Sequence, residues 1–196
     1  MVSGLTGCVI VSGMPGAGKS TVTGLVAHRL PKAAQVRGDD MNLMIKSGYV
    51  GWMDKPADDA LQQDELCNRN MCSLASNFID FGFTVLMDTV LADRAELDFF
   101  LALMSPRPVR LVVLAPGVEA CKHRNATRNP DDHFAFDGYE RLDADMQREF
   151  GDVGWWFDTS SLTAEETAER LAIEAADRTF PIAAGWHKWL RQRHDV

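Results

Sequence analysis

The stretch Gly13-Met14-Pro15-Gly16-Ala17-Gly18-Lys19-Ser20 matches the pattern G-x-x-x-x-G-K-[ST] at every fixed position. It directly follows the apolar run Cys8-Val9-Ile10-Val11, which predicts a strand, and it leads into a predicted helix that starts at Lys19. A glycine-rich turn between a strand and a helix points backbone N–H groups and the positive end of the helix dipole at one place, where an anion binds. We interpret residues 13–20 as a phosphate-binding loop rather than a structural turn. Lys19 is expected to reach the β- and γ-phosphates of a nucleotide, and the Ser20 hydroxyl to offer a ligand for Mg²⁺.

The composition limits the classes of protein to which the chain can belong. Its 196 residues suffice for one α/β domain with a full core, and no linker or repeat divides them, so we expect one domain over residues 1–196. The net charge of −8 disfavours binding to nucleic acid or to anionic membranes, although a local basic groove stays open. No apolar run has membrane-spanning length, and no basic segment precedes the first apolar residues. We therefore expect neither a membrane span nor a signal peptide.

The cysteines indicate a reducing environment. Cys8, Cys67, Cys72 and Cys121 are scattered and form no C-x-x-C pair, and three of them fall inside apolar patterns. We expect reduced thiols in the core and a cytoplasmic location, with a zinc site as the alternative.

Apolar runs of strand length alternate with helical patterns along the chain, which is typical of a parallel sheet covered by helices on both faces. The predicted strands are 8–11, 34–36, 84–87, 109–114 and 155–157. The predicted helices are 19–30, 59–80 and two that begin with capping boxes at Asp93 and Thr163. The sequence thus predicts an α/β fold of three layers around a five-stranded parallel sheet.

Carboxylates follow two of the predicted strands, at the edge where parallel sheets bind their ligands. Asp39 and Asp40 come after the second strand, and Asp88 comes after the third. Transfer of a phosphoryl group to a hydroxyl needs one carboxylate to orient and deprotonate the acceptor and another to hold Mg²⁺. One of the paired aspartates is therefore a candidate base, the alternative being an N-cap for a helix near Met41. For Asp88 a magnesium ligand, an acceptor-binding carboxylate and a turn residue at the strand end all stay open.

Two arginines follow the fourth predicted strand. Arg124 and Arg128 are four residues apart, so they share one face wherever this segment is helical. Guanidinium groups placed there would neutralise charge on a transferring phosphoryl group. The polar segment after them predicts a small lid over about residues 124–138. The alternative is a solvated arginine face paired with Asp131 and Asp132.

Taken in order, four motifs resemble those of the P-loop kinases that include chloramphenicol phosphotransferase, polynucleotide 5′-hydroxyl kinase and the zeta toxins. They are Gly13 to Thr21, Gly38-Asp39-Asp40, Met87-Asp88-Thr89 and Arg124-Asn125-x-x-Arg128. The resemblance covers the chain from Cys8 to about Ala175. It implies a P-loop NTPase fold, ATP and Mg²⁺ as cofactors, and Thr21 as a further nucleotide-binding residue.

The same resemblance implies roles for particular side chains. Asp39 corresponds to the catalytic base, and Arg124 and Arg128 correspond to lid arginines that grip ATP. Asn42 departs from the pattern, because the polynucleotide kinases and zeta toxins have Arg or Lys there. The resemblance therefore does not extend to their phosphorylated or nucleotide-sugar acceptors.

Two further segments carry aromatic residues. Tyr49 and Trp52 stand among glycines in a predicted loop, so they are candidates for lining a pocket for an apolar small molecule, the alternative being the core. Residues of about 184–194 predict a short helix with one apolar face. We expect this helix to pack on the domain or on the second subunit of a homodimer, and a role at a membrane surface is the weaker interpretation.

These observations predict a cytoplasmic, ATP-dependent kinase that moves the γ-phosphate to a hydroxyl group of a small molecule, such as an antibiotic or a nucleoside-like compound. The predicted catalytic residues are Asp39, Lys19 and Arg128. The predicted metal ligands are Ser20 and Asp88. The predicted acceptor-binding residues are Asp39, Asp40, Asp88, Tyr49 and Trp52.

Two other functions fit the same motifs. A polynucleotide 5′-hydroxyl kinase would need a basic groove, and the acidic composition and Asn42 count against it. A nucleotide-binding resistance protein, resembling the tunicamycin-resistance proteins, would sequester its ligand without transfer. The paired aspartates count against this second alternative. The sequence does not identify the acceptor or distinguish ATP from GTP as the donor.

Overall fold

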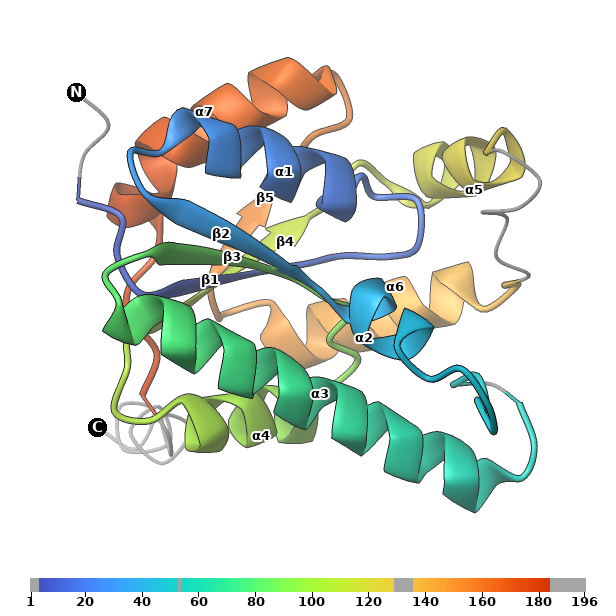
Figure 1. The fold of residues 1–196 in the computed structure, drawn as a ribbon. Coiled ribbons are helices and arrows are strands. Elements are labelled where there is room, and N and C mark those ends of the chain that lie inside the picture. The colour runs from blue at the N-terminus through green and yellow to red at the C-terminus, as the bar shows by residue number, and fades with distance from the viewer. Residues whose placement is uncertain (1–3, 53, 129–135, 184–196) are drawn as a thin grey trace, which may run out of the picture.

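A five-stranded sheet in which every strand pair is parallel forms the centre of the molecule. The computed structural model describes residues 4–52, 54–128 and 136–183. Its strands are β1 (Cys8–Ser12), β2 (Ala33–Arg37), β3 (Thr84–Asp88), β4 (Val109–Leu114) and β5 (Trp155–Phe157), in the order β2-β3-β1-β4-β5 (Figure 1). The predicted α/β fold is confirmed.

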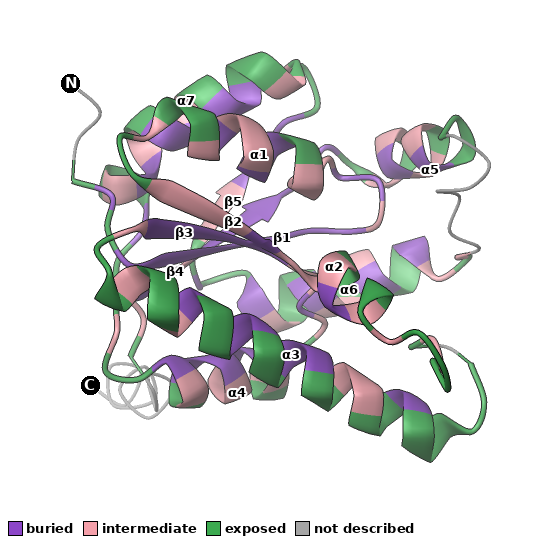
Figure 2. Ribbon diagram, in the orientation of Figure 1, coloured by how far each residue is buried: buried purple, intermediate pink, exposed green. Residues whose placement is uncertain are grey.

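The three inner strands explain why the sequence predicts this sheet so clearly. Every residue of β1 and β3 is buried, and so is every residue of β4 except Arg110 (Figure 2). A parallel strand covered on both faces needs apolar side chains in both directions, which gives continuous apolar runs rather than alternation. The register pairs Cys8 with Val85 on one side and with Val109 on the other, so the C-terminal ends of these strands lie along one edge.

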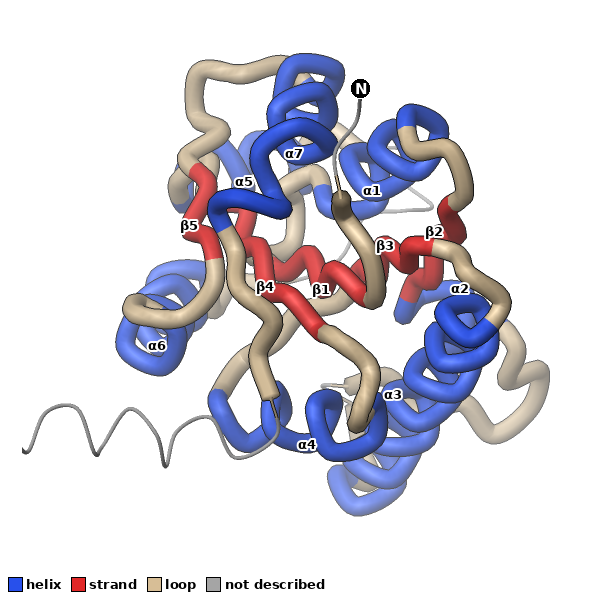
Figure 3. The backbone as a smooth tube through the Cα atoms, turned by 90° about the vertical axis from the view of Figure 1, so that its left-hand side faces the viewer, coloured by secondary structure: helices blue, strands red, loops and turns tan. Residues whose placement is uncertain are grey.

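Helices cover both faces of the sheet and make the three layers. One face carries α1 (Lys19–Arg29) and α7 (Ala164–Arg178), which pack against each other. The other face carries α3 (Ala57–Asp80), α4 (Arg94–Met104) and α6 (Tyr139–Phe150) (Figures 1 and 3). The short helices α2 (Gly38–Leu43) and α5 (Val118–Ala126) follow β2 and β4 directly.

The predicted helix ends agree with the structure to within two residues. The capping box at Thr163 is confirmed, since Thr163 and Glu166 cap each other. At Asp93 only half of the predicted box forms: the Asp93 carboxylate accepts a hydrogen bond from the Glu96 backbone N–H at 2.9 Å, but the Glu96 carboxylate accepts from the Ala92 backbone N–H instead of that of Asp93. Helix α3 begins at Ala57, directly behind a proline and two residues before the predicted start.

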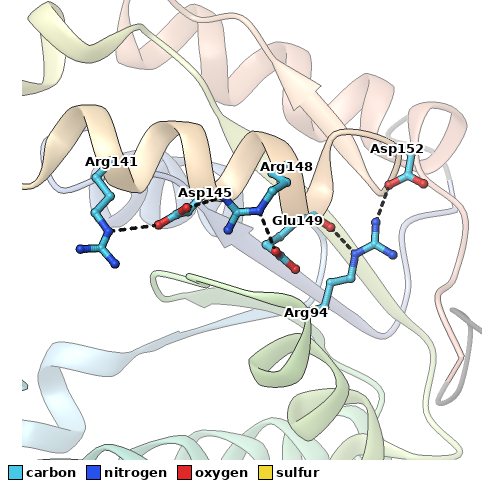
Figure 4. Close-up of polar contacts among 6 residues, drawn as sticks. All are labelled: Arg94, Arg141, Asp145, Arg148, Glu149 and Asp152. Carbon is cyan, nitrogen blue, oxygen red and sulfur yellow. Dashed lines mark hydrogen bonds and ion pairs between the residues drawn. The ribbon is translucent and has the colours of Figure 1, made fainter.

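The helix α6 was not predicted, although its apolar positions recur at helical spacing. Tyr139, Leu142, Met146 and Phe150 are buried against the core, while charged residues occupy the outer face. Figure 4 shows these charges as a row of ion pairs that runs along α6 to Arg94 on α4. The Arg94 guanidinium also donates to the Glu149 carbonyl at 2.6 Å. This row joins the end of α6 to the first turn of α4.

Several other expectations concern the surface and the termini. All four cysteines are buried and unpaired, as predicted for core thiols. Within residues 4–52, 54–128 and 136–183, no helix is both long and apolar enough to cross a membrane. Residues 129–135 of the predicted lid and the whole predicted C-terminal helix, together with the homodimer contact expected of that helix, lie outside the described residues.

A hydrogen bond from Leu91 to Ser12 joins the segment after β3 to the end of β1, and its contribution to stability can be tested. The buried Ser12 hydroxyl accepts a hydrogen bond from the Leu91 backbone N–H at 2.9 Å, which fixes the segment after β3. Ser12→Ala would leave that buried N–H without a partner, so we expect the free energy of unfolding to fall by about 1–3 kcal/mol in urea denaturation. The control Ser73→Ala removes an exposed hydroxyl on α3 and should change it by less than about 0.5 kcal/mol. Equal effects of the two substitutions would contradict the assignment.

Candidate active site

The phosphate-binding loop passes between β4 and α5 so closely that two positions admit only glycine. Gly13 and Gly16 have φ angles of 143° and 84°. A Cβ atom would lie 2.6 Å from the Leu114 carbonyl oxygen at Gly13 and 2.3 Å from the Cys121 carbonyl oxygen at Gly16. Both the backbone conformation and the neighbouring backbone therefore require glycine here. The loop then enters α1 at Lys19, as the motif predicts.

Lys19 lies over its own loop. Its Nζ donates to the carbonyl oxygens of Gly13 at 2.9 Å and of Met14 at 3.2 Å. Burial lowers the pKa of the Lys19 ammonium, and the carboxylates of Asp88 and Asp39 act in the opposite direction. The ammonium therefore lies close to both carboxylates, which come from two different elements.

Asp88 is the last residue of β3 and lies in the sheet rather than in a turn. It is 5% exposed, and its backbone pairs in register with Val11 of β1 and Arg37 of β2. Burial raises the pKa of its carboxyl, while the Lys19 ammonium and a hydrogen bond from the Ser20 hydroxyl lower it. Asp88 is thus a buried carboxylate directly beside the start of α1.

The oxygen atoms of Ser20 and Asp88 fit the chemistry of Mg²⁺. This ion takes oxygen ligands in an octahedron, usually from one or two protein side chains together with water and substrate phosphates. In the part of the chain that the structure describes, no group of three or more His, Cys, Asp or Glu side chains is placed to hold a metal. A magnesium ion at Ser20 and Asp88 would therefore take its remaining ligands from the nucleotide and from water.

Asp39 and Asp40 lie in the first turn of α2, and neither caps it. The helix begins at Gly38, three residues earlier than expected, and its N-cap is Arg37 without a side-chain hydrogen bond. The N-cap interpretation of the aspartates is therefore wrong. Only Asp39 of the two contributes to the pKa shifts of Lys19 and Asp88, so its charge is the one that acts on the phosphate-binding loop. The Arg37 guanidinium lies between the two carboxylates, with Nη2 3.9 Å from Asp39 Oδ2 and Nη1 3.6 Å from Asp40 Oδ1.

The two arginines approach the loop from α5, but not from one helical face. Helix α5 ends at Ala126, and Arg128 follows in the turn that closes it, so the shared helical face is wrong for Arg128. Arg124 Nη1 lies 4.0 Å from the position of a Cβ atom at Gly18. Arg128 contributes to lowering the pKa of Lys19, after burial. Both guanidinium groups are therefore near the phosphate-binding loop. Asp131 and Asp132 lie outside the described residues.

The aromatic side chains of the loop after α2 do not enter the core. Tyr49 and Trp52 are each 49% exposed, which excludes the core interpretation. Burial raises the pKa of the Tyr49 phenol, and Asp39 makes the next contribution. The charge of Asp39 therefore reaches the Tyr49 phenol. The predicted pocket for an apolar molecule stays a prediction.

A polar network between α3 and the start of α4 was not predicted from the sequence. Buried Asn68 on α3 donates to Asp64 at 3.3 Å, and it also hydrogen-bonds Glu96 at the start of α4. Glu96 accepts from the Ala92 backbone N–H at 2.9 Å, and burial raises its pKa to about 7. The only signal in the sequence was the capping box at Asp93, which says nothing of a contact with α3.

Comparisons with known proteins agree with this geometry. The family model described as AAA domain (AAA_33) matches residues 8–152, and the chain belongs to this family. None of the curated proteins matches the chain in sequence.

Solved structures share the fold at low sequence identity. A sugar kinase from Janibacter sp. HTCC2649 has a TM-score of 0.63 at 20% identity, over 88% of this chain and 95% of its own. The tunicamycin resistance protein of Deinococcus radiodurans has a TM-score of 0.66 at 15% identity, over 90% and 99%. Shikimate kinase from Acinetobacter baumannii has a TM-score of 0.60 at 18% identity, over 85% and 90%. The fold is thus that of small P-loop kinases, and the subgroup predicted from the motifs stays a prediction.

The close approach at Gly16 predicts a selective loss of nucleotide binding. In Gly16→Ala the methyl group would meet the Cys121 carbonyl oxygen, so the loop has to move away from its anion-binding geometry. We expect the affinity for ATP, measured by calorimetry, to fall at least about tenfold, the equivalent of 1.4 kcal/mol. The control Gly48→Ala carries a similar positive φ but has open space around it, and should keep the wild-type affinity. Equal affinities of the two variants would contradict this geometry.

The buried carboxyl of Glu96 predicts a pH-dependent stability. Its folded-state pKa of about 7 lies above the ordinary value of 4.5, so folding favours the protonated form. This contribution is fully present below about pH 4.5 and is lost as the pH rises through about 7, which amounts to roughly 3 kcal/mol. Glu96→Gln removes it, so the stability of the variant relative to wild type should rise over that pH range in urea denaturation. The exposed Glu65→Gln is the control, and parallel curves for Glu96→Gln and wild type would refute the effect.

Proposed function

We propose that this protein is an ATP-dependent kinase that transfers the γ-phosphoryl group of ATP to a hydroxyl group of a small molecule. The observation that carries the proposal is the convergence of Lys19, Asp88 and Asp39 from α1, β3 and α2 beside the phosphate-binding loop. An ammonium for phosphates, a carboxylate for Mg²⁺ and a second carboxylate for an acceptor are the parts that phosphoryl transfer requires. The similarity of the fold to a sugar kinase and to a shikimate kinase supports this reaction class.

The donor half of the site would work through charge and position. The backbone N–H groups of residues 13–20 and the Lys19 ammonium hold the β- and γ-phosphates. Ser20 and Asp88 would hold Mg²⁺, which would supply positive charge against the phosphates. Arg124 lies by Gly18, and Arg128 lies near Lys19, so both would stabilise charge that moves toward the leaving ADP.

The acceptor half would work through Asp39. Its side chain is 78% exposed, so a substrate can reach it, and it lies near the ammonium that would mark the γ-phosphate. The acceptor hydroxyl gives its proton to the Asp39 carboxylate as its oxygen forms a bond to the γ-phosphorus. The bond between that phosphorus and the bridging oxygen breaks, and the electron pair leaves with ADP.

The charges around Asp39 support an acceptor without a phosphate group. Asp40 lies beside it in α2, and the neighbouring cation Arg37 is already within ion-pair distance of both aspartates. Asn42 adds no positive charge. An anionic acceptor would therefore meet two carboxylates whose neighbouring cation, Arg37, is already paired. A neutral or cationic alcohol is the better fit.

A binding protein without transfer is the second candidate, because the tunicamycin resistance protein has the highest TM-score of the three structures described above. In that case the protein would bind ATP and release no ADP with any hydroxyl compound. A panel of hydroxylated antibiotics, sugars and nucleosides, with a 5′-hydroxyl oligonucleotide as a further member, separates these functions by ADP release above the blank. Release with the oligonucleotide alone would indicate a polynucleotide kinase.

Asp39 supplies the sharpest test of the kinase. Asp39→Asn keeps the shape of the side chain but cannot take a proton, so we expect kcat to fall by about 10²–10⁴-fold while the affinity for ATP is unchanged. The control is Asp40→Asn in the same helical turn. Asp40 is not among the groups that shift the pKa of Lys19, so this variant should lose far less of its kcat. Unchanged turnover by Asp39→Asn, or an equal loss in both variants, would remove Asp39 from the role of base.

A further inference from the structure

Gln63, on the second turn of α3, holds the loop that carries Tyr49 with both ends of its side-chain amide. Its Oε1 accepts a hydrogen bond from the Val50 backbone N–H at 2.9 Å, and its Nε2 donates to the Gly48 carbonyl oxygen at 2.8 Å. The two bonded residues flank Tyr49 on either side. The backbone of Tyr49 is therefore fixed relative to α3 from both directions.

This clamp has no substitute elsewhere in the loop. The other hydrogen bonds of residues 45–52 are local: Ile45 is bonded to Asn42, and Gly51 is bonded to Asp54 in both directions. Among the residues that the structure describes, the two hydrogen bonds of Gln63 are thus the ones that join this loop to α3. Because exposed loops gain little order from burial, losing both bonds would release the Tyr49 segment.

The same face of α3 also holds the helix that carries Asp39. Cys67, four residues after Gln63 and hence on the same helical face, lies 3.4 Å from the Gly38 carbonyl oxygen through its Sγ. Gly38 directly precedes Asp39 at the start of α2. Successive turns of α3 therefore set the positions of Tyr49 and Asp39 relative to each other.

The charge of Asp39 reaches the Tyr49 phenol. The pKa of the phenol is raised by burial first and then by Asp39, Asp54 and Cys67. Its hydroxyl lies 3.8 Å from the position that a Cβ atom would take at Gly51, in the loop that Gln63 holds. The phenol stays protonated at neutral pH and can donate a hydrogen bond.

We infer that Gln63 is a positioning residue of the acceptor site: it holds the Tyr49 hydroxyl opposite Asp39, with the acceptor alcohol bound between the phenol and the carboxylate. The inference rests on the proposed kinase function. It adds a residue that touches neither the nucleotide nor the acceptor, and it explains why the loop of an exposed aromatic side chain is held by both ends of one side-chain amide.

The first test measures the position of Tyr49 without any substrate. The chain has two tyrosines, so Tyr139→Phe leaves Tyr49 as the single phenol, whose ionisation is followed by ultraviolet absorbance. In this background Gln63→Met, which keeps length and helix propensity, should lower the Tyr49 pKa toward its ordinary value of 10. The control Gln62→Met changes the neighbouring exposed glutamine and should leave the pKa as it is. Circular dichroism at each pH shows that the variants stay folded, and an unchanged pKa in Gln63→Met would overturn the inference.

The second test separates acceptor binding from nucleotide binding. With the hydroxyl compound of the panel above that the wild-type protein phosphorylates fastest, Gln63→Met should raise the KM for that compound about tenfold and leave the KM for ATP unchanged. A KM for the compound equal to that of Gln62→Met would overturn the inference while the kinase function stands. If the wild-type protein binds ATP but phosphorylates no compound, the proposed function fails and takes this inference with it.

Discussion

The active-site geometry depends on the close contact between the phosphate-binding loop and the carbonyl groups of Leu114 and Cys121. At Gly13 and Gly16 the loop backbone lies where any Cβ atom would come within 2.6 Å of a carbonyl oxygen. The loop is therefore fixed against β4 and α5 by backbone atoms, whose positions side-chain substitutions change little. A loop held in this way directs its N–H groups and the start of α1 at one point before any ligand arrives, so binding an anion costs little reorganisation.

From that fixed point the parallel sheet determines what else can approach. Because β1, β2 and β3 run in register, the residues that end them lie along one edge, and Arg37 and Asp88 are direct neighbours across it. Asp88 is buried there beside Lys19, where burial favours the neutral form of each group and the opposite charge favours the ionised form. Each charge therefore favours the ionised form of the other against the effect of burial, which distinguishes this buried pair from a surface ion pair.

The sequence allowed the sheet and the glycine-rich loop between β1 and α1 to be predicted because their determinants are local. For the motif over residues 13–20 and for the apolar runs of β1, β3 and β4, a few adjacent residues are enough to predict the local structure. Helix α6 could also have been predicted from the helical spacing of its apolar residues, which are Tyr139, Leu142, Met146 and Phe150. Its N-cap is Gly138, which offers no capping side chain, so the usual signal for a helix start is absent there. The contacts of Gln63 and Asn68 could not be predicted, since a glutamine or asparagine in a helix has no pattern that names its partner in another segment. The start of α2 was misjudged because aspartates are favourable both at an N-cap and in the first turn.

The similarity to known proteins follows the same division between local and distant determinants. The donor half lies within the region that the AAA domain model matches, and similar structures with 15–20% identity keep the whole fold. The proposed acceptor half would be assembled by side-chain contacts of α3 with two separate segments, the loop of Tyr49 and the start of α2. We expect a substitution on that face of α3 to alter this half without disturbing the sheet or the phosphate-binding loop. The fold can therefore be retained while the acceptor changes, so the identity of the acceptor has to be sought in residues such as Gln63, Tyr49 and Asp39 of this chain and not in its relatives.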